Sequence, residues 1–211
     1  MTLKSSKEQD AGRRKQLMDI AVQLFAQKGY PNTKISDIVA AAGVAQGTFY
    51  WYFKSKQEIV IQLVADGHAR LLQVIGQGYR KQSGTVDDMV KSSTKLMKDL
   101  LEFAESNRHL MALMFIEGSG GDEAIRSAIS ETRIAIEQAF RRNIERAVEL
   151  KMLPDHIDFA LRSSILTSLV EGTISRWLFG AGHDMSHKPA LPADVVAAEL
   201  ARFEFFGLLG S

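Results

Sequence analysis

A run of hydrogen-bonding and aromatic side chains beginning at Gln46 has the types and spacing that suit contact with nucleic acid. Gln46, Gly47 and Thr48 would open a helix with no side chain longer than glutamine, so the helix end could enter a DNA major groove. The hydroxyls of Tyr50 and Tyr52 can donate hydrogen bonds to phosphate oxygens. The segment therefore predicts a helix that contacts base edges and the phosphates beside them. The alternative is that the aromatic side chains are core residues and the neighbouring lysines are solvated charge.

Two features are costly for a free helix and favour a nearby polyanion. Gly47 costs a helix about 1 kcal/mol relative to alanine, which a close backbone approach to DNA would explain. Arg13, Arg14 and Lys15 are expected in the first turn of the first helix, where the helix dipole favours acidic residues. Phosphates close to that turn would reverse the preference.

A helix, a tight turn and a second helix are expected to position these groups. The apolar spacing predicts short helices at 35–42 and 46–53, joined at Gly43, which can adopt the positive φ that the turn requires. A longer helix ending at Gly29 precedes them. The residues that should pack this unit together are Leu17, Ile20, Ala21, Leu24, Phe25, Ile35, Ile38, Val39, Val44, Phe49 and Phe53.

The charge distribution also separates the two ends of the chain. The formal net charge is +1, but residues 1–56 carry nine Lys/Arg against four Asp/Glu, and residues 57–211 carry seventeen against twenty-one. The excess of positive charge therefore lies in the first quarter. This asymmetry is typical of a polyanion-binding end joined to a neutral or acidic body.

Composition places the chain among globular proteins. The 211 residues are 45% apolar and include no cysteine, which favours a reducing, cytoplasmic setting. No apolar run approaches the roughly 20 residues of a membrane span, and residues 1–10 are too polar for a signal peptide. We expect a cytoplasmic protein without a membrane partner.

Helical spacing continues through the rest of the sequence and predicts an all-α protein of about nine helices. The expected later helices are 56–81, 86–103, 110–116, 122–153 from an Asp122 N-cap, 157–179 and 195–209. Helix 157–179 is apolar on more than one face and needs a cover, which a second copy of the chain would supply. We expect a DNA-binding domain at 1–55, an effector-binding and dimerisation domain at 56–211, and a homodimer.

Residues 11–56 resemble the DNA-binding domain of the TetR family of transcriptional regulators. The residues at the family's spacing are Ala21, Phe25, Gly29, Tyr30, Thr33, Ile35, Asp37, Ile38, Ala42, Gly43, Val44, Gly47, Phe49, Tyr50, Tyr52, Phe53, Ser55 and Lys56. The rest of the chain matches only in length and helical layout. The resemblance implies a dimeric repressor whose last two helices form a four-helix bundle with a partner and whose operator is released by a small-molecule effector.

The resemblance also implies particular DNA contacts. Base contacts are expected from Lys34, Ser36, Gln46, Gly47, Thr48 and Trp51, and phosphate contacts from Thr33, Tyr50, Tyr52 and Lys56. Two positions depart from the family pattern, because Lys34 and Ala45 have no oxygen to cap the helices that follow them. Thr33 is the alternative cap for the first of these helices.

The body contains side chains suited to an adaptable apolar cavity, because methionine re-packs around varied shapes. The candidates are Met89, Met97, Phe103, Met111, Met114, Phe115, Phe140, Trp177 and Phe179, with Asn143, Glu171 and Arg176 as polar groups. Ordinary core packing is the alternative for each apolar residue, and solvent exposure for each polar one. The predicted effector is small and largely apolar, with an acyl-CoA or a fatty acid as one option.

Two other classes of function have weaker support in the sequence. An enzyme lacks support, because His183 and His187 have only Asp184 as a third possible metal ligand, and the glycines at 118, 120 and 121 do not follow a strand as a phosphate-binding loop would. We expect no catalytic residues, cofactor or metal. A helical binding module that uses the apolar body alone would leave Gly47 unexplained.

Overall fold

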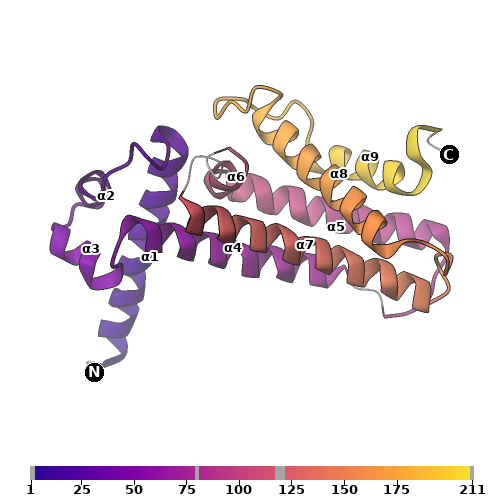
Figure 1. Ribbon diagram of the computed structural model, residues 1–211, viewed down its shortest axis with the longest axis horizontal. Helices are drawn as coiled ribbons and strands as arrows, with labels where there is room; N and C mark the ends of the chain where they lie inside the picture. The colour runs from indigo at the N-terminus through magenta and orange to yellow at the C-terminus, as the bar shows by residue number, and fades with distance from the viewer. Residues whose placement is uncertain (1–2, 79–80, 117–121, 210–211) are drawn as a thin grey trace. The chain divides into compact units, whose positions relative to one another are not determined.

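The computed structural model describes residues 3–78, 81–116 and 122–209 (Figure 1). Regular structure in these ranges is helical, without a strand, which confirms the all-α prediction. The helices are α1 (Leu3–Lys28), α2 (Ile35–Ala42), α3 (Gln46–Tyr52), α4 (Lys56–Gln77), α5 (Val86–Ser106), α6 (Arg108–Phe115), α7 (Glu123–Glu149), α8 (Phe159–Phe179) and α9 (Ala193–Phe206), followed by a short 3-10 turn, Gly207–Leu209. The glycine loop expected at 118–121 lies outside the described residues.

Helix α1 begins earlier than the sequence analysis expects. It starts at Leu3, so Arg13, Arg14 and Lys15 lie in its middle and not in its first turn. The helix dipole is felt mainly within the terminal turns, so the dipole argument for phosphates near this triplet is wrong. The helix ends as predicted, at Gly29, whose φ of 81° breaks the helical backbone.

The turn between α2 and α3 has the predicted geometry. Gly43 adopts φ 65° and ψ 37°, its N–H donates to the carbonyl of Ala40, and the N–H of Val44 donates to the carbonyl of Val39 over 3.0 Å. These bonds satisfy carbonyls at the end of α2 while the chain reverses direction. Figure 1 shows the two short helices beside α1.

Neither short helix has a side-chain oxygen at its N-cap, where Lys34 and Ala45 stand. At α2 the carboxylate of Asp37 instead accepts the backbone N–H of Lys34 over 3.0 Å. Thr33 does not cap α2, because its hydroxyl donates to the carbonyls of Leu24 and Gly29. Asp122 does accept the N–H of Ile125 over 3.1 Å, as predicted for the start of α7.

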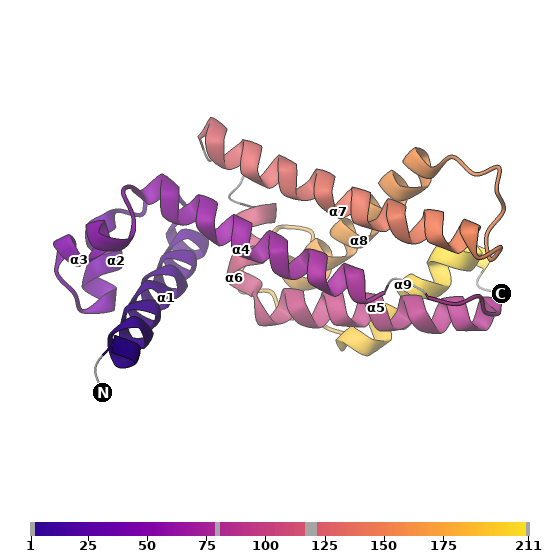
Figure 2. The same ribbon diagram turned by 90° about the horizontal axis from the view of Figure 1, so that it is seen from below.

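The described chain forms two compact units. The first consists of the described residues within Met1–Gly67 and His109–Ser130, and the second of those within His68–Arg108 and Glu131–Ser211. The expected functional boundary after residue 55 stays a prediction. The first unit has an apolar core in which Phe25, Phe49 and Phe53 are almost completely buried. In the second unit, α9 packs against α5 (Figure 2).

Several helices end short of their predicted limits. Helix α4 stops at Gln77, and α7 stops at Glu149, where Lys151 has a positive φ of 56° before Pro154. Helix α8 begins at Phe159, because the side chain of Asp158 caps it by accepting the N–H of Leu161 over 3.0 Å. Apolar spacing does not locate such caps, so the observed helix ends differ from the predicted ones by a few residues.

Among the described residues, α4 alone is long and apolar enough to span a membrane by length and composition, a candidate that the sequence analysis did not identify. The core helix of a soluble protein passes the same test. Three of the apolar residues of α4, Ile59, Val60 and Val64, are at most 1% exposed and belong to the core of the first unit. Their burial explains the apolar character of α4.

Candidate nucleic-acid interface

Helix α3 separates its supporting side chains from its outward ones. Phe49 is completely buried and Phe53, at the end of the helix, is 1% exposed, whereas Tyr50 is 52% and Trp51 78% exposed. The two phenylalanine rings are in tilted contact, with 5.6 Å between their centroids and 45° between their planes. Two aromatic anchors therefore hold the helix to the core and leave large aromatic side chains in solvent.

The beginning of α3 is open on its outer side. Gln46 and Gly47 are exposed and Thr48 is half-buried. A Cβ atom built on Gly47 would meet no atom within 4 Å, and the residue does not adopt a positive φ. Neither internal packing nor backbone conformation requires glycine at this position. Its presence is consistent with close approach of an external partner to the backbone.

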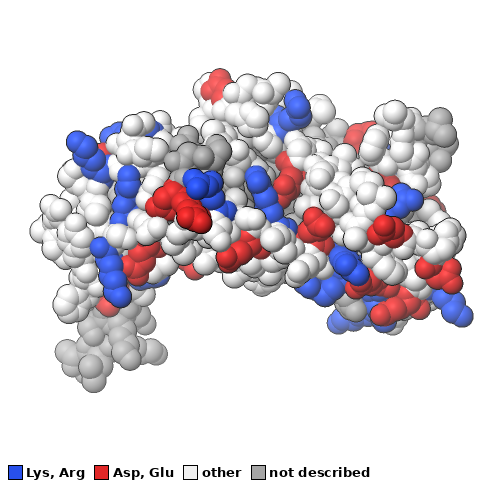
Figure 3. Space-filling view, viewed as in Figure 1, with Lys and Arg blue, Asp and Glu red and all other residues white. Residues whose placement is uncertain are grey.

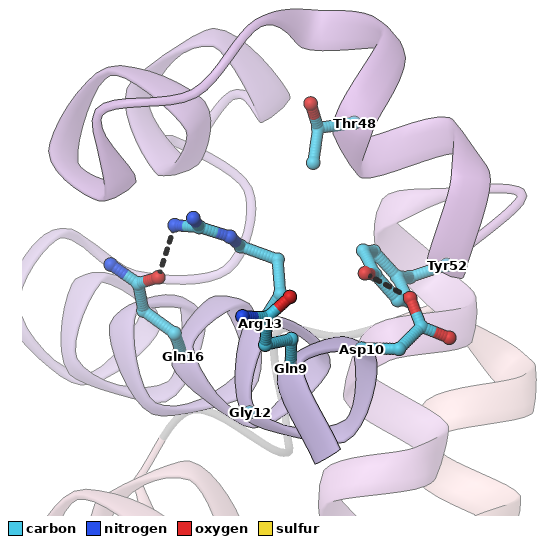
Figure 4. Close-up of a pocket in the computed structure, with 7 residues that line it drawn as sticks. All are labelled: Gln9, Asp10, Gly12, Arg13, Gln16, Thr48 and Tyr52. Carbon is cyan, nitrogen blue, oxygen red and sulfur yellow. Dashed lines mark hydrogen bonds between the residues drawn. The ribbon is translucent and has the colours of Figure 1, made fainter. Parts of the chain in front are cut away.

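An open concave surface, which encloses about 740 Å³, lies between the N-terminal half of α1 and α3 (Figure 4). Residues from α1 line one side, and Thr48 and Tyr52 line the other. The full lining is Gln9, Asp10, Gly12, Arg13, Gln16, Thr48 and Tyr52. Figure 4 shows the hydrogen bond of 2.7 Å from Arg13 to Gln16, which places an exposed guanidinium at this concave surface.

Tyr52 is tied to α1 by a hydrogen bond that the sequence did not indicate. Its hydroxyl donates to the Asp10 carboxylate over 2.5 Å, and this bond, with a smaller contribution from desolvation, raises the pKa of Tyr52. The two residues are 42 positions apart, so no local spacing could have paired them. Asp10 puts a negative charge next to a residue expected at a phosphate.

The three consecutive basic residues of α1 have different environments. Arg14 hydrogen bonds to Gln62 and places its guanidinium 5.4 Å from the centroid of the Phe53 ring, so it supports α3 from behind. Lys15 pairs with Asp19 over 2.7 Å. Of the triplet, Arg13 is the one whose side chain lines the concave surface beside α3.

Two residues expected to contact phosphates, Thr33 and Lys56, make hydrogen bonds within the protein. Thr33 is completely buried, and its hydroxyl and backbone N–H both donate to carbonyls of the preceding segment. The ammonium of Lys56 donates to the carbonyls of Tyr30 over 2.6 Å and of Thr33 over 2.9 Å, and it lies 4.2 Å from the centroid of the Tyr30 ring. Burial lowers the pKa of Lys56. Together the pair holds the 30–33 loop that leads into α2.

Lys34 and Ser36, by contrast, are exposed at the beginning of α2. Figure 3 shows that Lys/Arg and Asp/Glu side chains are interspersed on the face that it draws, in keeping with the net charge of +1. The net charge of the whole chain is small, so attraction for a polyanion would come from the excess of positive charge within residues 1–56. Recognition would therefore depend on local groups such as Arg13 and Lys34.

A separate cavity of about 90 Å³ lies within the second unit. Of the predicted ligand residues, Met97, Phe140 and Asn143 line it, as does Met89. Ser93 and Glu204, which no sequence pattern identifies, also line it, and Ser93 on α5 donates a hydrogen bond to Glu204 on α9. A polar pair whose members are 111 positions apart leaves no periodic signal.

The other predicted ligand residues do not line this cavity. Met111 and Met114 are buried and Phe115 is half-buried, all in the part of α6 that belongs to the first unit. In the second unit, Phe103 lies under the guanidinium of Arg70 at 4.9 Å, and the indole of Trp177 donates to the carbonyl of Leu191 over 2.8 Å. These side chains have structural contacts of their own.

The two polar candidates on α8 also lie apart from the cavity. Glu171 is 3.8 Å from Arg133, and burial, partly opposed by that arginine, raises the pKa of its carboxyl. Arg176 is exposed. The described residues hold no group of three His, Asp or Glu side chains placed to bind a metal ion. The Asp184 carboxylate accepts the N–H and hydroxyl of Ser186, which lower its pKa.

Comparison with known proteins places the interface in a family context. Residues 17–63 match the family model described as bacterial regulatory proteins, tetR family. The transcriptional regulator AcrR of Shigella flexneri is 24% identical over 181 residues, which are 83% of each chain. These matches include the region of α2 and α3.

Two solved structures share the fold. The fatty acid degradation regulator FadR of Bacillus halodurans has a TM-score of 0.78 at 19% identity, over 93% of this chain and 96% of its own. FadR of Bacillus subtilis, solved in complex with stearoyl-CoA, has a TM-score of 0.75 at 18% identity, over 92% of this chain and 98% of its own. The likeness therefore extends through the helices that follow the interface.

Proposed function

Because the chain is a member of the TetR family of transcriptional regulators, we propose that it is a homodimeric repressor that binds operator DNA through α2 and α3 and is released by a small, largely apolar effector. The observation that carries this proposal is the outward face of α3. Its first turn is open at Gly47, and Trp51 is 78% exposed beside it. Such an arrangement suits insertion of the helix into a major groove.

Within this proposal the DNA contacts divide into two groups. Gln46, Gly47, Thr48 and Trp51 contact base edges from α3, supported by Lys34 and Ser36 at the beginning of α2. Tyr50 and Arg13 contact phosphates on either side of the groove. Tyr52 reaches a phosphate when its bond to Asp10 opens. Thr33 and Lys56 act indirectly, because they fix the loop that leads into α2.

The proposed dimer forms through α8 and α9. Exposed apolar side chains on these helices include Leu161 and Ile165, which are 57% and 52% exposed, and Val195 and Phe203, which are each 42% exposed. A second copy of the same surface would cover them in an isologous interface. The dimer would present two copies of α3 to successive major grooves, about 34–36 Å apart.

Release of the operator is proposed to follow from a population shift between two dimer states. Helix α4 is continuous from Lys56 to Gln77 and contributes to both compact units, and Gly78 at its end lines the 90 Å³ cavity. A ligand that displaces the end of α4 would change the spacing of the two α3 helices. The effector must then bind the two states with different affinities, and operator DNA must weaken effector binding by the same factor.

This function assigns the protein to the cytoplasm, where the DNA is, and requires no cofactor, metal or catalytic residue. The contrasting possibility, a binding module that uses the second unit alone, gives α3 no function. The open position at Gly47 favours the repressor.

A gel-shift experiment with the DNA upstream of the protein's own gene tests the proposal. We expect a complex of dimer size that Thr48→Ala weakens at least tenfold, because Thr48 borders the concave surface at α3. Ser83→Ala, an equivalent change at an exposed loop residue of the second unit, is the control and should leave binding unchanged. Equal binding by the wild type and Thr48→Ala would contradict the assignment of α3 as the reading helix.

A further inference from the structure

The 90 Å³ cavity of the second unit has apolar walls and one acidic side chain. Met97, Phe140 and Leu166 are among its apolar residues, and Glu204 brings a carboxyl from α9. Ser92, Ser93 and Asn143 are the other polar side chains in the lining, which contains no lysine, arginine or histidine. The cavity therefore carries a potential negative charge with no positive charge in its lining.

The carboxyl of Glu204 has one hydrogen-bond partner among the described side chains, the hydroxyl of Ser93 on α5. Burial raises the pKa of Glu204, and the bond from Ser93 opposes the shift only in part. An ionised carboxylate in apolar surroundings is costly unless a donor or a cation compensates it. A ligand with a positive charge would supply that compensation, whereas a carboxylate or phosphate group would add a second negative charge.

We propose that this cavity binds a small apolar amine as its ammonium ion, with the ammonium on the Glu204 carboxylate and the hydrocarbon against Met97, Phe140 and Leu166. The inference rests on the proposed function, because it names the chemical class of the effector. It disfavours the fatty acid or acyl-CoA suggested by the sequence. Ligand sites usually measure roughly 300–1,000 Å³, so a cavity of about 90 Å³ suits a short hydrocarbon or the end of a longer one.

Isothermal titration of the full chain at pH 7, without DNA, tests the proposal with three probes of equal chain length. These are n-hexylammonium chloride, sodium hexanoate and 1-hexanol. We expect hexylammonium to bind at least tenfold more tightly than hexanoate, with hexanol between them. Hexanoate binding as tightly as hexylammonium, or no binding of hexylammonium to the folded protein, would overturn the proposal.

Variants then locate the charge that is responsible. Glu204→Gln keeps the shape of the side chain and an oxygen that accepts the Ser93 hydroxyl. It should therefore weaken the binding of hexylammonium at least tenfold and change the affinity for hexanol less than twofold. The control is Glu199→Gln, which removes an exposed carboxylate from the same helix and should leave all three affinities unchanged. Equal hexylammonium affinity in Glu204→Gln and the wild type would refute the role of Glu204. If Glu204→Gln does not fold, the comparison of hexylammonium with hexanoate on the wild type decides.

The gel shift separates this inference from the proposed function. Intact operator binding without hexylammonium binding would refute the ligand class alone. Hexylammonium binding by a protein that does not bind DNA would refute the repressor alone. Hexylammonium binding that does not weaken the DNA complex would leave the amine site in place and refute its role as the effector site.

Discussion

Replacement of Gly47 by alanine should stabilise the fold while weakening the DNA complex. A Cβ at this position meets no atom within 4 Å and the backbone φ is not positive, so the methyl group introduces neither a clash nor strain. Inside a helix, replacing glycine by alanine increases the free energy of unfolding by up to about 1 kcal/mol, partly because alanine restricts the unfolded chain. For a chain of this size that gain raises Tm by about 2–4 °C.

The same methyl group would occupy the space that a base pair or phosphate needs at α3. We expect the dissociation constant for operator DNA to rise at least tenfold, equivalent to about 1.4 kcal/mol. Thermal melting by circular dichroism and a gel shift on the same preparations measure the two effects. Gly76→Ala is the matched control, because Gly76 is an exposed helical glycine of α4 with equally open space. It should raise Tm similarly and leave DNA binding unchanged. Unchanged DNA affinity in Gly47→Ala would refute the close-approach explanation, and a lower Tm would refute the inference that the position is open.

Three further changes test other contacts. Asp10→Asn removes a negative charge beside Tyr52, so the affinity for DNA should rise several-fold at low salt and less at high salt. Filter binding at two salt concentrations measures this, and a lower affinity would show that Asp10 assists binding. Thr33→Val removes the buried hydroxyl that donates to the carbonyls of Leu24 and Gly29, while the backbone N–H still donates to Gly29. We expect the free energy of unfolding to fall by about 1–2 kcal/mol in a urea titration. Weaker DNA binding at unchanged stability would instead support Thr33 as a phosphate ligand. Burial raises the pKa of Glu204 above 4.5, so its contribution to stability is present below pH 4.5 and is lost as pH rises through the folded-state pKa. Glu204→Gln should therefore raise Tm at pH 8 and leave Tm nearly unchanged at pH 4. An equal shift in Tm at both pH values would contradict this.

The helix-turn-helix was predictable because its determinants are local. Gly43 marks the turn, and the spacing of Phe49 and Phe53 predicts that both face the core, where the structure buries Phe49 on α3 and Phe53 directly after it. The start of α1 was not predictable, because residues 4–10 are all polar and carry no apolar repeat. The internal bonds of Lys56 were not predictable for a different reason: its partners are backbone carbonyls 23–26 positions earlier, and no side-chain pattern identifies them.

The cavity was only partly predictable. Apolar spacing identifies buried faces, so Met97 and Phe140 were found, but it does not tell which buried faces surround an empty space. Met111 was assigned to the ligand site on the same grounds, although it belongs to the first unit. The Ser93 and Glu204 pair depends on the packing of α5 against α9, which no local pattern specifies.

The separation of buried anchor residues from exposed side chains at α3 affects which substitutions this protein can tolerate. Its attachment to the core depends on Phe49 and Phe53, while Gln46 and Trp51 make no contribution to that core. Substitutions on the outer side therefore cost little folding free energy, since exposed positions usually shift stability by less than about 0.5 kcal/mol. Under the proposed function, the DNA sequence that α3 recognises can therefore be changed, by mutation or by design, while the fold stays the same.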